Sequence, residues 1–236
     1  MGSIQRRVFL VSSVLAATGA VACARNPQTS ELELVEPSAQ FDRATFAKLV
    51  DAPHALARQL WDSGTYDPLV LGAIKNALNG WQFGFGLAPE KIAMAACFHG
   101  AANAYLYNEH LWQRYHLGQA LGLKDPSGDI ITTNIFYPAR TPYDTLADPN
   151  DPHAMYQDGT VQALQRRGVV FLACHTAAAD LARELVAGGA APAGMTAQAV
   201  LNDLLANLVP KAFAVPSQVA TIGYLQLRYH YAYTTT

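Results

Sequence analysis

The chain has 236 residues, of which 51% are hydrophobic and 14% are charged, and its formal net charge is −2 at neutral pH. This composition supports a sizeable core and excludes a largely disordered chain. The mildly acidic balance, without a basic run, argues against a nucleic-acid partner. Three cysteines are present, and only Cys97 and Cys174 lie in the body of the chain. A disulfide framework therefore does not hold this protein together.

Residues 1–24 are typical of an export signal. Arg6 and Arg7 precede an apolar stretch and a run of small residues, a pattern that resembles a twin-arginine signal and is too short to span a bilayer. We therefore expect a periplasmic protein, and loss of the two arginines takes the formal charge from −2 to −4. Residues 20–23 also resemble a weak lipobox, so membrane attachment is expected only if Cys23 is lipidated.

Residues 25–54 form a polar lead-in with a short helix expected near Phe46, and residues 55–236 carry the domain. A strand is expected over 55–62, although its propensity is poor. Asp67 and Pro68 then predict the cap and first turn of a helix over 68–81. The next strand covers 91–98 and ends at His99, and residues 101–121 are helical with a break near Asn108.

An insertion over residues 122–157 interrupts this alternation with five prolines. A segment of this length is either a lid, an interaction arm or a packed insertion. Asp158 is predicted to cap a short helix, which is followed by a strand over 169–173 and a helix over 176–187. A helix over 196–208, a strand over 212–215, a helix opened by Pro216 and a strand over 229–233 complete the chain.

Five strands that alternate with helices predict an α/β fold with a doubly wound parallel sheet in three α/β/α layers. In the common flavodoxin-like order 2-1-3-4-5, strand 55–62 lies between the strands that end at His99 and Cys174. The outer two strands are then about 10 Å apart, which disfavours a Cys97–Cys174 disulfide. The same order gathers five side chains around one crevice: Asp62, Ser63, His99, Cys174 and His175.

Cys174 is the strongest candidate for chemistry. An apolar strand delivers it to the carboxyl edge of the sheet and to the start of the next helix, where the helix N-terminus favours a thiolate. His99 or His175 is suited to move a proton, and the backbone N–H groups of Thr176 and Ala177 are candidate donors to a bound anion. The alternative is a small buried cysteine beside two structural histidines, one at a strand end and one on a helix cap.

The run Val170-Phe-Leu-Ala-Cys174-His-Thr-Ala-Ala-Ala resembles the DsrE/DsrF-like proteins of sulfur relay. Residues 75–80, 98–100, 164–168 and 203–226 extend the resemblance over about 56–233, closest to an exported branch of that family. It implies a cysteine persulfide on Cys174, a substrate-binding role for Asn76, and no cofactor. It also implies a trimer or hexamer that exchanges sulfur with a small sulfur species or a thiol protein.

Two other classes of function fit the sequence. A non-catalytic oligomeric scaffold would keep the fold and use the insertion to recognise a partner. Haem or metal binding would use His110 and His116 with Trp112 and Tyr115. The six-residue spacing of these histidines is poor for one helix face, and no C-x-x-C-H attachment motif is present.

Overall fold

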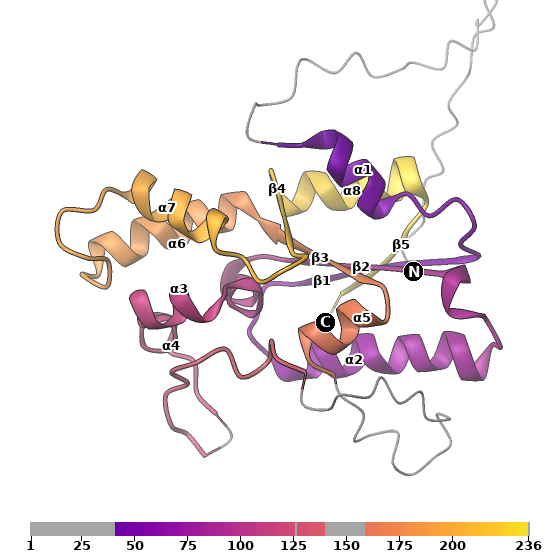
Figure 1. The fold of residues 1–236 in the computed structure, drawn as a ribbon, viewed down its shortest axis with the longest axis horizontal. Helices are drawn as coiled ribbons and strands as arrows, with labels where there is room; N and C mark the ends of the chain where they lie inside the picture. Colours follow the sequence, from indigo (N-terminus) through magenta and orange to yellow (C-terminus); the bar gives the residue numbers. More distant parts are fainter. Residues whose placement is uncertain (1–40, 126, 140–158, 236) are drawn as a thin grey trace, which may run out of the picture. The chain divides into compact units, whose positions relative to one another are not determined.

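The structure is a computed structural model that describes residues 41–125, 127–139 and 159–235. It confirms a five-stranded, all-parallel sheet flanked by helices (Figure 1). The strands are β1 (Ala57–Ser63), β2 (Ile92–Phe98), β3 (Val169–Cys174), β4 (Phe213–Val215) and β5 (Ala232–Thr235). The α-helices are α1 (Arg43–Val50), α2 (Pro68–Asn79), α3 (Glu109–Arg114), α4 (Leu117–Ala120), α5 (Val161–Arg166), α6 (His175–Ala187), α7 (Ala197–Ala206) and α8 (Gln218–Tyr229).

The predicted strand order 2-1-3-4-5 is wrong, because the sheet has the order β4-β3-β2-β1-β5. Strand β2, and not β1, lies beside β3, while β5 pairs with the free edge of β1. The reason lies in the direction of each crossover. From β1 to β4 each new strand is added beside the previous one, on the same side. Only β5 is placed at the opposite edge of the sheet, beside β1. Because crossovers are right-handed, α2 and α5 share one face, while α8 joins α1 on the other (Figure 1).

Each face of the sheet has its own apolar cluster. On the α2 and α5 face, Ile74 packs with Phe98 and Phe171. On the α1 and α8 face, Leu60 and Leu172 pack with Leu225. This burial on both faces explains why β2 and β3 read as nearly continuous apolar runs in the sequence.

A third apolar cluster contains no strand residue. Helices α6 and α7 pack against each other and against α3 and α4, with Trp112, Tyr115, Leu185 and Leu204 buried between them. These four helices lie together beyond one end of the sheet (Figure 1). Helix α6 therefore starts at the carboxyl end of β3 and runs beside the site, instead of returning across the sheet.

Two predicted helices differ in detail. The helix expected over 101–121 is a 3-10 helix, η3 (Gly100–Leu106), followed by α3 and α4. The predicted break near Asn108 is confirmed, because its side chain accepts a hydrogen bond from the Leu111 N–H and caps α3. Helix α5 is capped by Thr160, whereas Asp158, its predicted cap, lies outside the described residues.

Several predicted features lie outside the described residues: the export signal over 1–24 with Cys23, most of the lead-in, and residues 140–157 of the insertion. The described part of the insertion is anchored to the domain at Leu123, Ile131 and Asn134, which are buried, whereas residues 127–130 are exposed. Asn134 donates to the carbonyls of Tyr105 and Tyr107 at 3.0 and 2.8 Å. Within 41–125, 127–139 and 159–235, no helix has the length and apolar character needed to cross a membrane.

Candidate functional site

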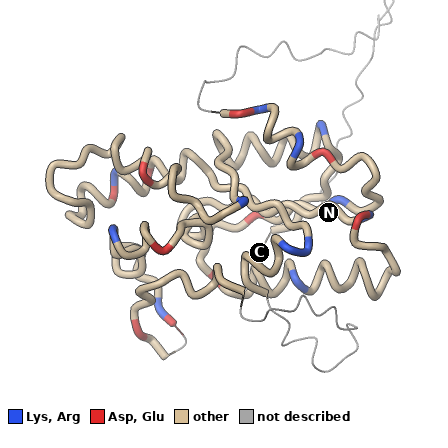
Figure 2. The backbone as a smooth tube through the Cα atoms, viewed as in Figure 1, with Lys and Arg blue, Asp and Glu red and all other residues tan. Residues whose placement is uncertain are grey.

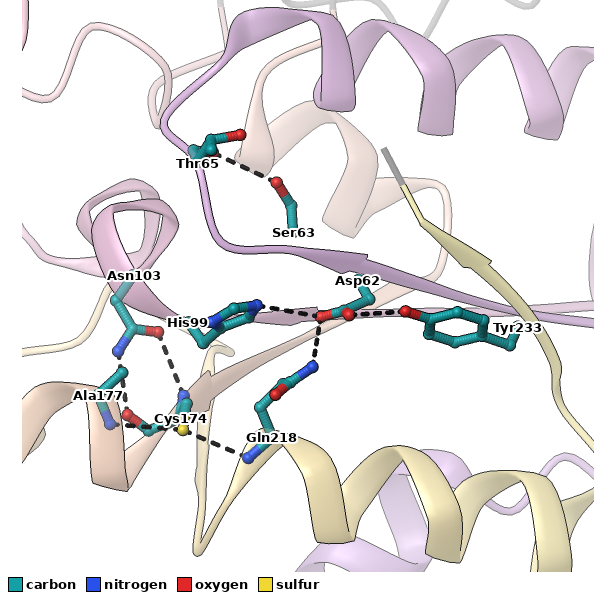
Figure 3. A network of polar contacts seen from close by, with 9 residues as sticks. All are labelled: Asp62, Ser63, Thr65, His99, Asn103, Cys174, Ala177, Gln218 and Tyr233. Atoms are coloured by element: carbon teal, nitrogen blue, oxygen red, sulfur yellow. Dashed lines mark hydrogen bonds and ion pairs between the residues drawn. The ribbon is translucent and has the colours of Figure 1, made fainter.

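Cys174 ends β3 and is the N-cap of α6. Its Sγ accepts a hydrogen bond from the Ala177 N–H at 3.5 Å and one from the Gln218 N–H at 3.3 Å (Figure 3). Ala177 lies in the first turn of α6, and Gln218 is the first residue of α8. Two helix N-termini therefore meet at one sulfur atom, and both favour negative charge there.

Cys174 lies in the wall of a cavity of about 490 Å³. Cys174 as a residue is only 4% exposed, so most of it is covered, yet it contributes to this lining. His99 and Gly100 line the cavity from the end of β2, and Val219 lines it from α8. Because Val219 is 74% exposed, the cavity reaches the protein surface. The carboxyl ends of three strands thus frame the candidate site, as expected for an open parallel sheet.

Asn103 fixes the backbone of Cys174. Its Nδ2 donates to the Cys174 carbonyl at 3.0 Å, and its Oδ1 accepts from the Cys174 N–H at 3.2 Å. The Asn103 side chain is buried and belongs to η3, which follows β2. Strand β2 ends before it reaches Cys174, and the Asn103 side-chain amide takes over the hydrogen bonds to the backbone of β3. This pairing holds Cys174 at the start of α6.

Asp62, at the end of β1, joins three elements (Figure 3). Its Oδ1 accepts from Gln218 Nε2 at 2.8 Å, and its Oδ2 accepts from the Tyr233 hydroxyl at 2.9 Å, which raises the pKa of Tyr233. His99 Nε2 lies 3.5 Å from Oδ1 and forms an ion pair when the imidazole is protonated. Gln218 therefore connects Asp62 to the sulfur, since its side chain binds the carboxylate while its N–H reaches Sγ.

Gly64 gives the His99 ring the space it occupies. A Cβ atom at Gly64 would lie 2.6 Å from His99 Cε1, closer than packed atoms tolerate. Gly100, which follows His99, has φ +50°, and a Cβ there would lie 2.8 Å from the Gly64 carbonyl oxygen. Both glycines are therefore needed for the close approach of the β1 and β2 loops.

The structure brings together four of the predicted site residues at the cavity or in its polar network: Asp62, His99, Cys174 and Ala177. Thr176 also lines the cavity, but its hydroxyl donates to the Pro216 carbonyl at 3.1 Å and ties the start of α6 to the turn after β4. The predicted N–H donor is therefore present at Ala177.

The other three predicted residues lie elsewhere. Ser63 points away from Asp62, and its hydroxyl donates to the Thr65 carbonyl at 3.3 Å (Figure 3). Successive strand residues face opposite sides of a sheet, which explains this separation. Asn76 is exposed on α2, and neither Asn76 nor His175 belongs to the cavity lining.

Sequence reasoning missed Asn103, Gln218 and Tyr233. The rule that parallel strands deliver functional groups at their carboxyl ends could have found Gln218, which follows β4. Nothing local in the sequence indicates Asn103, because its role depends on the 3-10 turn after β2. Tyr233 reaches Asp62 only because β5 pairs with β1.

Cys97 lies on β2, next to β3, so the distance argument against a Cys97–Cys174 disulfide used the wrong neighbours. In the actual register Cys97 is opposite Leu172, two residues before Cys174. This diagonal offset still separates the α-carbons by ~8 Å, beyond disulfide reach. Both thiols are free, and burial, followed by the proximity of Cys174 and Asp62, raises the pKa of Cys97 well above its usual value.

Of the four residues proposed for haem or metal binding, Trp112 and Tyr115 are buried in the helical cluster, whereas His110 and His116 are exposed. The Tyr115 hydroxyl donates to Asp203 at 2.6 Å, and Trp112 Nε1 donates to the Ala104 carbonyl at 3.1 Å. His110 lies 4.0 Å from the same Asp203, and His116 is in a left-handed turn before α4. In the described part of the chain, no group of three or more His, Cys, Asp and Glu is arranged to hold a metal ion.

Searches against known protein families, curated proteins and solved structures found no match to this chain. The candidate site therefore has to be interpreted from its own geometry.

Proposed function

We propose that Cys174 accepts sulfane sulfur as a persulfide and transfers it to an acceptor thiol. The observation that carries this proposal is the position of Cys174, which lines a surface cavity and whose Sγ accepts hydrogen bonds from N–H groups at the starts of α6 and α8. These donors stabilise a thiolate or a persulfide anion more than they stabilise a neutral thiol. The resemblance of the segment around Cys174 to DsrE/DsrF-like proteins supports the same chemistry.

The proposed cycle needs no external oxidant or reductant. The Cys174 thiolate attacks the outer sulfur of a donor persulfide, so a bond forms from Sγ to that sulfur while the donor S–S bond breaks. The donor leaves as a thiolate with the electron pair. An acceptor thiolate then attacks the same sulfur, and Cys174 leaves as a thiolate. With thiosulfate as donor, the leaving group is sulfite.

His99 is the proposed proton carrier for both leaving thiolates. His99 lines the Cys174 cavity, and its Nε2 lies 3.5 Å from Asp62 Oδ1. A carboxylate in this position orients the ring and stabilises the imidazolium that forms when the ring takes up a proton. Asp62 is therefore a positioning residue, because it acts on the reaction through His99 and Gln218.

The test uses the full chain with a small persulfide donor. Intact mass spectrometry should detect one added sulfur atom, peptide mapping should place it on Cys174, and a later addition of thiol should remove it. Cys97→Ser is the matched control and should retain this behaviour. A chain that gains no sulfur, or gains it only on Cys97, would overturn the proposal.

A persulfide carrier of this kind fits an exported homo-oligomer, as the sequence predicts. Cell fractionation of the full chain and light scattering of the purified protein test these two points. A cytoplasmic monomer would contradict both.

A further inference from the structure

Two cavities lie along α6, one at Cys174 and one further along the helix. A second cavity of about 370 Å³ lies between α4 and the end of α6, and its lining includes His116 and Gly188. Leu181 and Glu184 belong to the walls of both cavities. The two cavities are therefore neighbours along α6, and we call them together the α6 groove.

The wall of this groove is acidic. Asp180 and Glu184 line the Cys174 cavity, and no Lys or Arg does. Asp180 forms an ion pair with Arg183 on its own helix, whereas Glu184 has no ion pair with any residue described in the structure. Charged residues are sparse and of mixed sign over the described chain (Figure 2), and Arg183 offsets Asp180, so the uncompensated charge of this wall is that of Glu184.

The Cys174 end of the groove favours negative charge, unlike its acidic wall. At Sγ, the N–H groups of Ala177 and Gln218 favour an anionic sulfur, while the carboxylates lie further along α6. Asp180 and Glu184 follow Cys174 by six and ten residues, which corresponds to about 9 and 15 Å of helix. A ligand that matches both ends carries a thiolate at one end and a positive charge at this distance from it.

We propose that the acceptor thiol belongs to an extended peptide segment with a Lys or Arg three to five residues from its cysteine. An extended chain rises about 3.3 Å per residue, so this spacing spans the distance from Sγ to the carboxylates. The apolar side chains Leu121 and Leu181 line the path between them. This inference rests on the proposed function, and it identifies the acceptor by charge and length.

The test compares three short peptides that differ only at the fourth residue after a single cysteine, which is Arg, Gln or Glu. Each peptide is mixed with the full chain persulfidated on Cys174, and the rate of sulfur transfer is measured at low salt. The Arg peptide should react roughly fivefold faster than the Glu peptide, and high salt should remove the difference.

Glu184→Gln should abolish most of this preference, so that the Arg, Gln and Glu peptides react at similar rates. Glu90→Gln is the matched control, because Glu90 is an exposed carboxylate just before β2, at the opposite end of that strand. The inference is overturned if the three peptides react equally, or if Glu184→Gln acts no more strongly than Glu90→Gln. Failure to form the persulfide at all would instead overturn the proposed function.

Discussion

Cys97 and Cys174 lie on adjacent parallel strands and are both buried as residues, with exposures of 0% and 4%, yet their environments differ. Cys97 lies inside the sheet, where Leu60, Leu172 and Leu225 belong to the same apolar cluster. Cys174 lies at the end of its strand, where two backbone N–H groups and a cavity meet its sulfur. The position of each cysteine along its strand therefore determines the environment of its thiol more than residue burial does.

Exchanging the two cysteines for serine gives the largest expected contrast. Cys174→Ser should abolish sulfur uptake completely, because the attacking atom is gone, whereas Cys97→Ser should keep the rate within about threefold. Intact mass after donor treatment measures both. If Cys174→Ser took up as much sulfur as the unchanged chain, Cys174 would not be the site of uptake.

Asn103→Leu should measure how much the two Asn103 hydrogen bonds to the Cys174 backbone stabilise the folded chain. The substitution keeps a similar volume but leaves the Cys174 N–H and carbonyl without the side-chain partner they have now. The free energy of unfolding should fall by about 2–4 kcal/mol, since each unpaired buried group costs about 1–3 kcal/mol. Urea denaturation measures this loss.

Asn76→Leu is the matched control for this change, because Asn76 is an exposed asparagine on α2. It should alter the free energy of unfolding by no more than about 0.5 kcal/mol. Equal effects of the two substitutions would show that Asn103 does not support the site.

Gly64→Ala tests whether the position of His99 matters. The added Cβ displaces the imidazole without removing it, and the rate of sulfur uptake should fall by roughly tenfold because catalytic geometry tolerates shifts of less than about 1 Å. Gly72→Ala on α2, where a Cβ meets nothing within 4 Å, should leave that rate unchanged. An unaltered rate in Gly64→Ala would exclude His99 from the reaction.

Alkaline pH should lower the stability of the folded chain because it ionises Cys97 in the unfolded state. Its folded pKa is raised above the usual value of 9.0, so the folded thiol stays protonated while the unfolded thiol ionises. The contribution of Cys97 to stability is therefore complete below pH 9 and is lost as the pH rises further, by at most about 1.4 kcal/mol per pH unit.

Buried tyrosines such as Tyr115 and Tyr231, whose pKa values are raised to about 12, add a loss of the same sign at higher pH. The informative quantity is the difference between the unchanged chain and Cys97→Ala in urea denaturation at pH 8 and pH 10. A difference that does not change between the two pH values would contradict the sealed environment of Cys97.

The sequence predicted the parts of the fold that depend on local pattern. Apolar runs located β2 and β3, and the residues at the ends of β1, β2 and β3 indicated Asp62, His99 and Cys174. The last strand was expected over 229–233, whereas α8 extends to Tyr229 and β5 covers Ala232–Thr235. Asp62, His99 and Cys174 come together in either strand order, because parallel strands end at one edge of the sheet. The site was therefore partly predictable although the assumed order was wrong.

The strand order and the supporting contacts were not predictable in the same way. Alternation of strands and helices does not reveal the direction of each crossover, so the return of β5 to β1 left no local trace. Tyr233 meets Asp62 only through that return. Asn103 reaches Cys174 only because η3 forms where a longer α-helix was expected.

We propose that Cys174 is the accessible nucleophile of the folded chain. Brief alkylation under native conditions, followed by peptide mapping, tests this accessibility. We predict rapid labelling of Cys174 and none of Cys97 until the chain is unfolded. Equal protection of both thiols, or faster labelling of Cys97, would contradict the account.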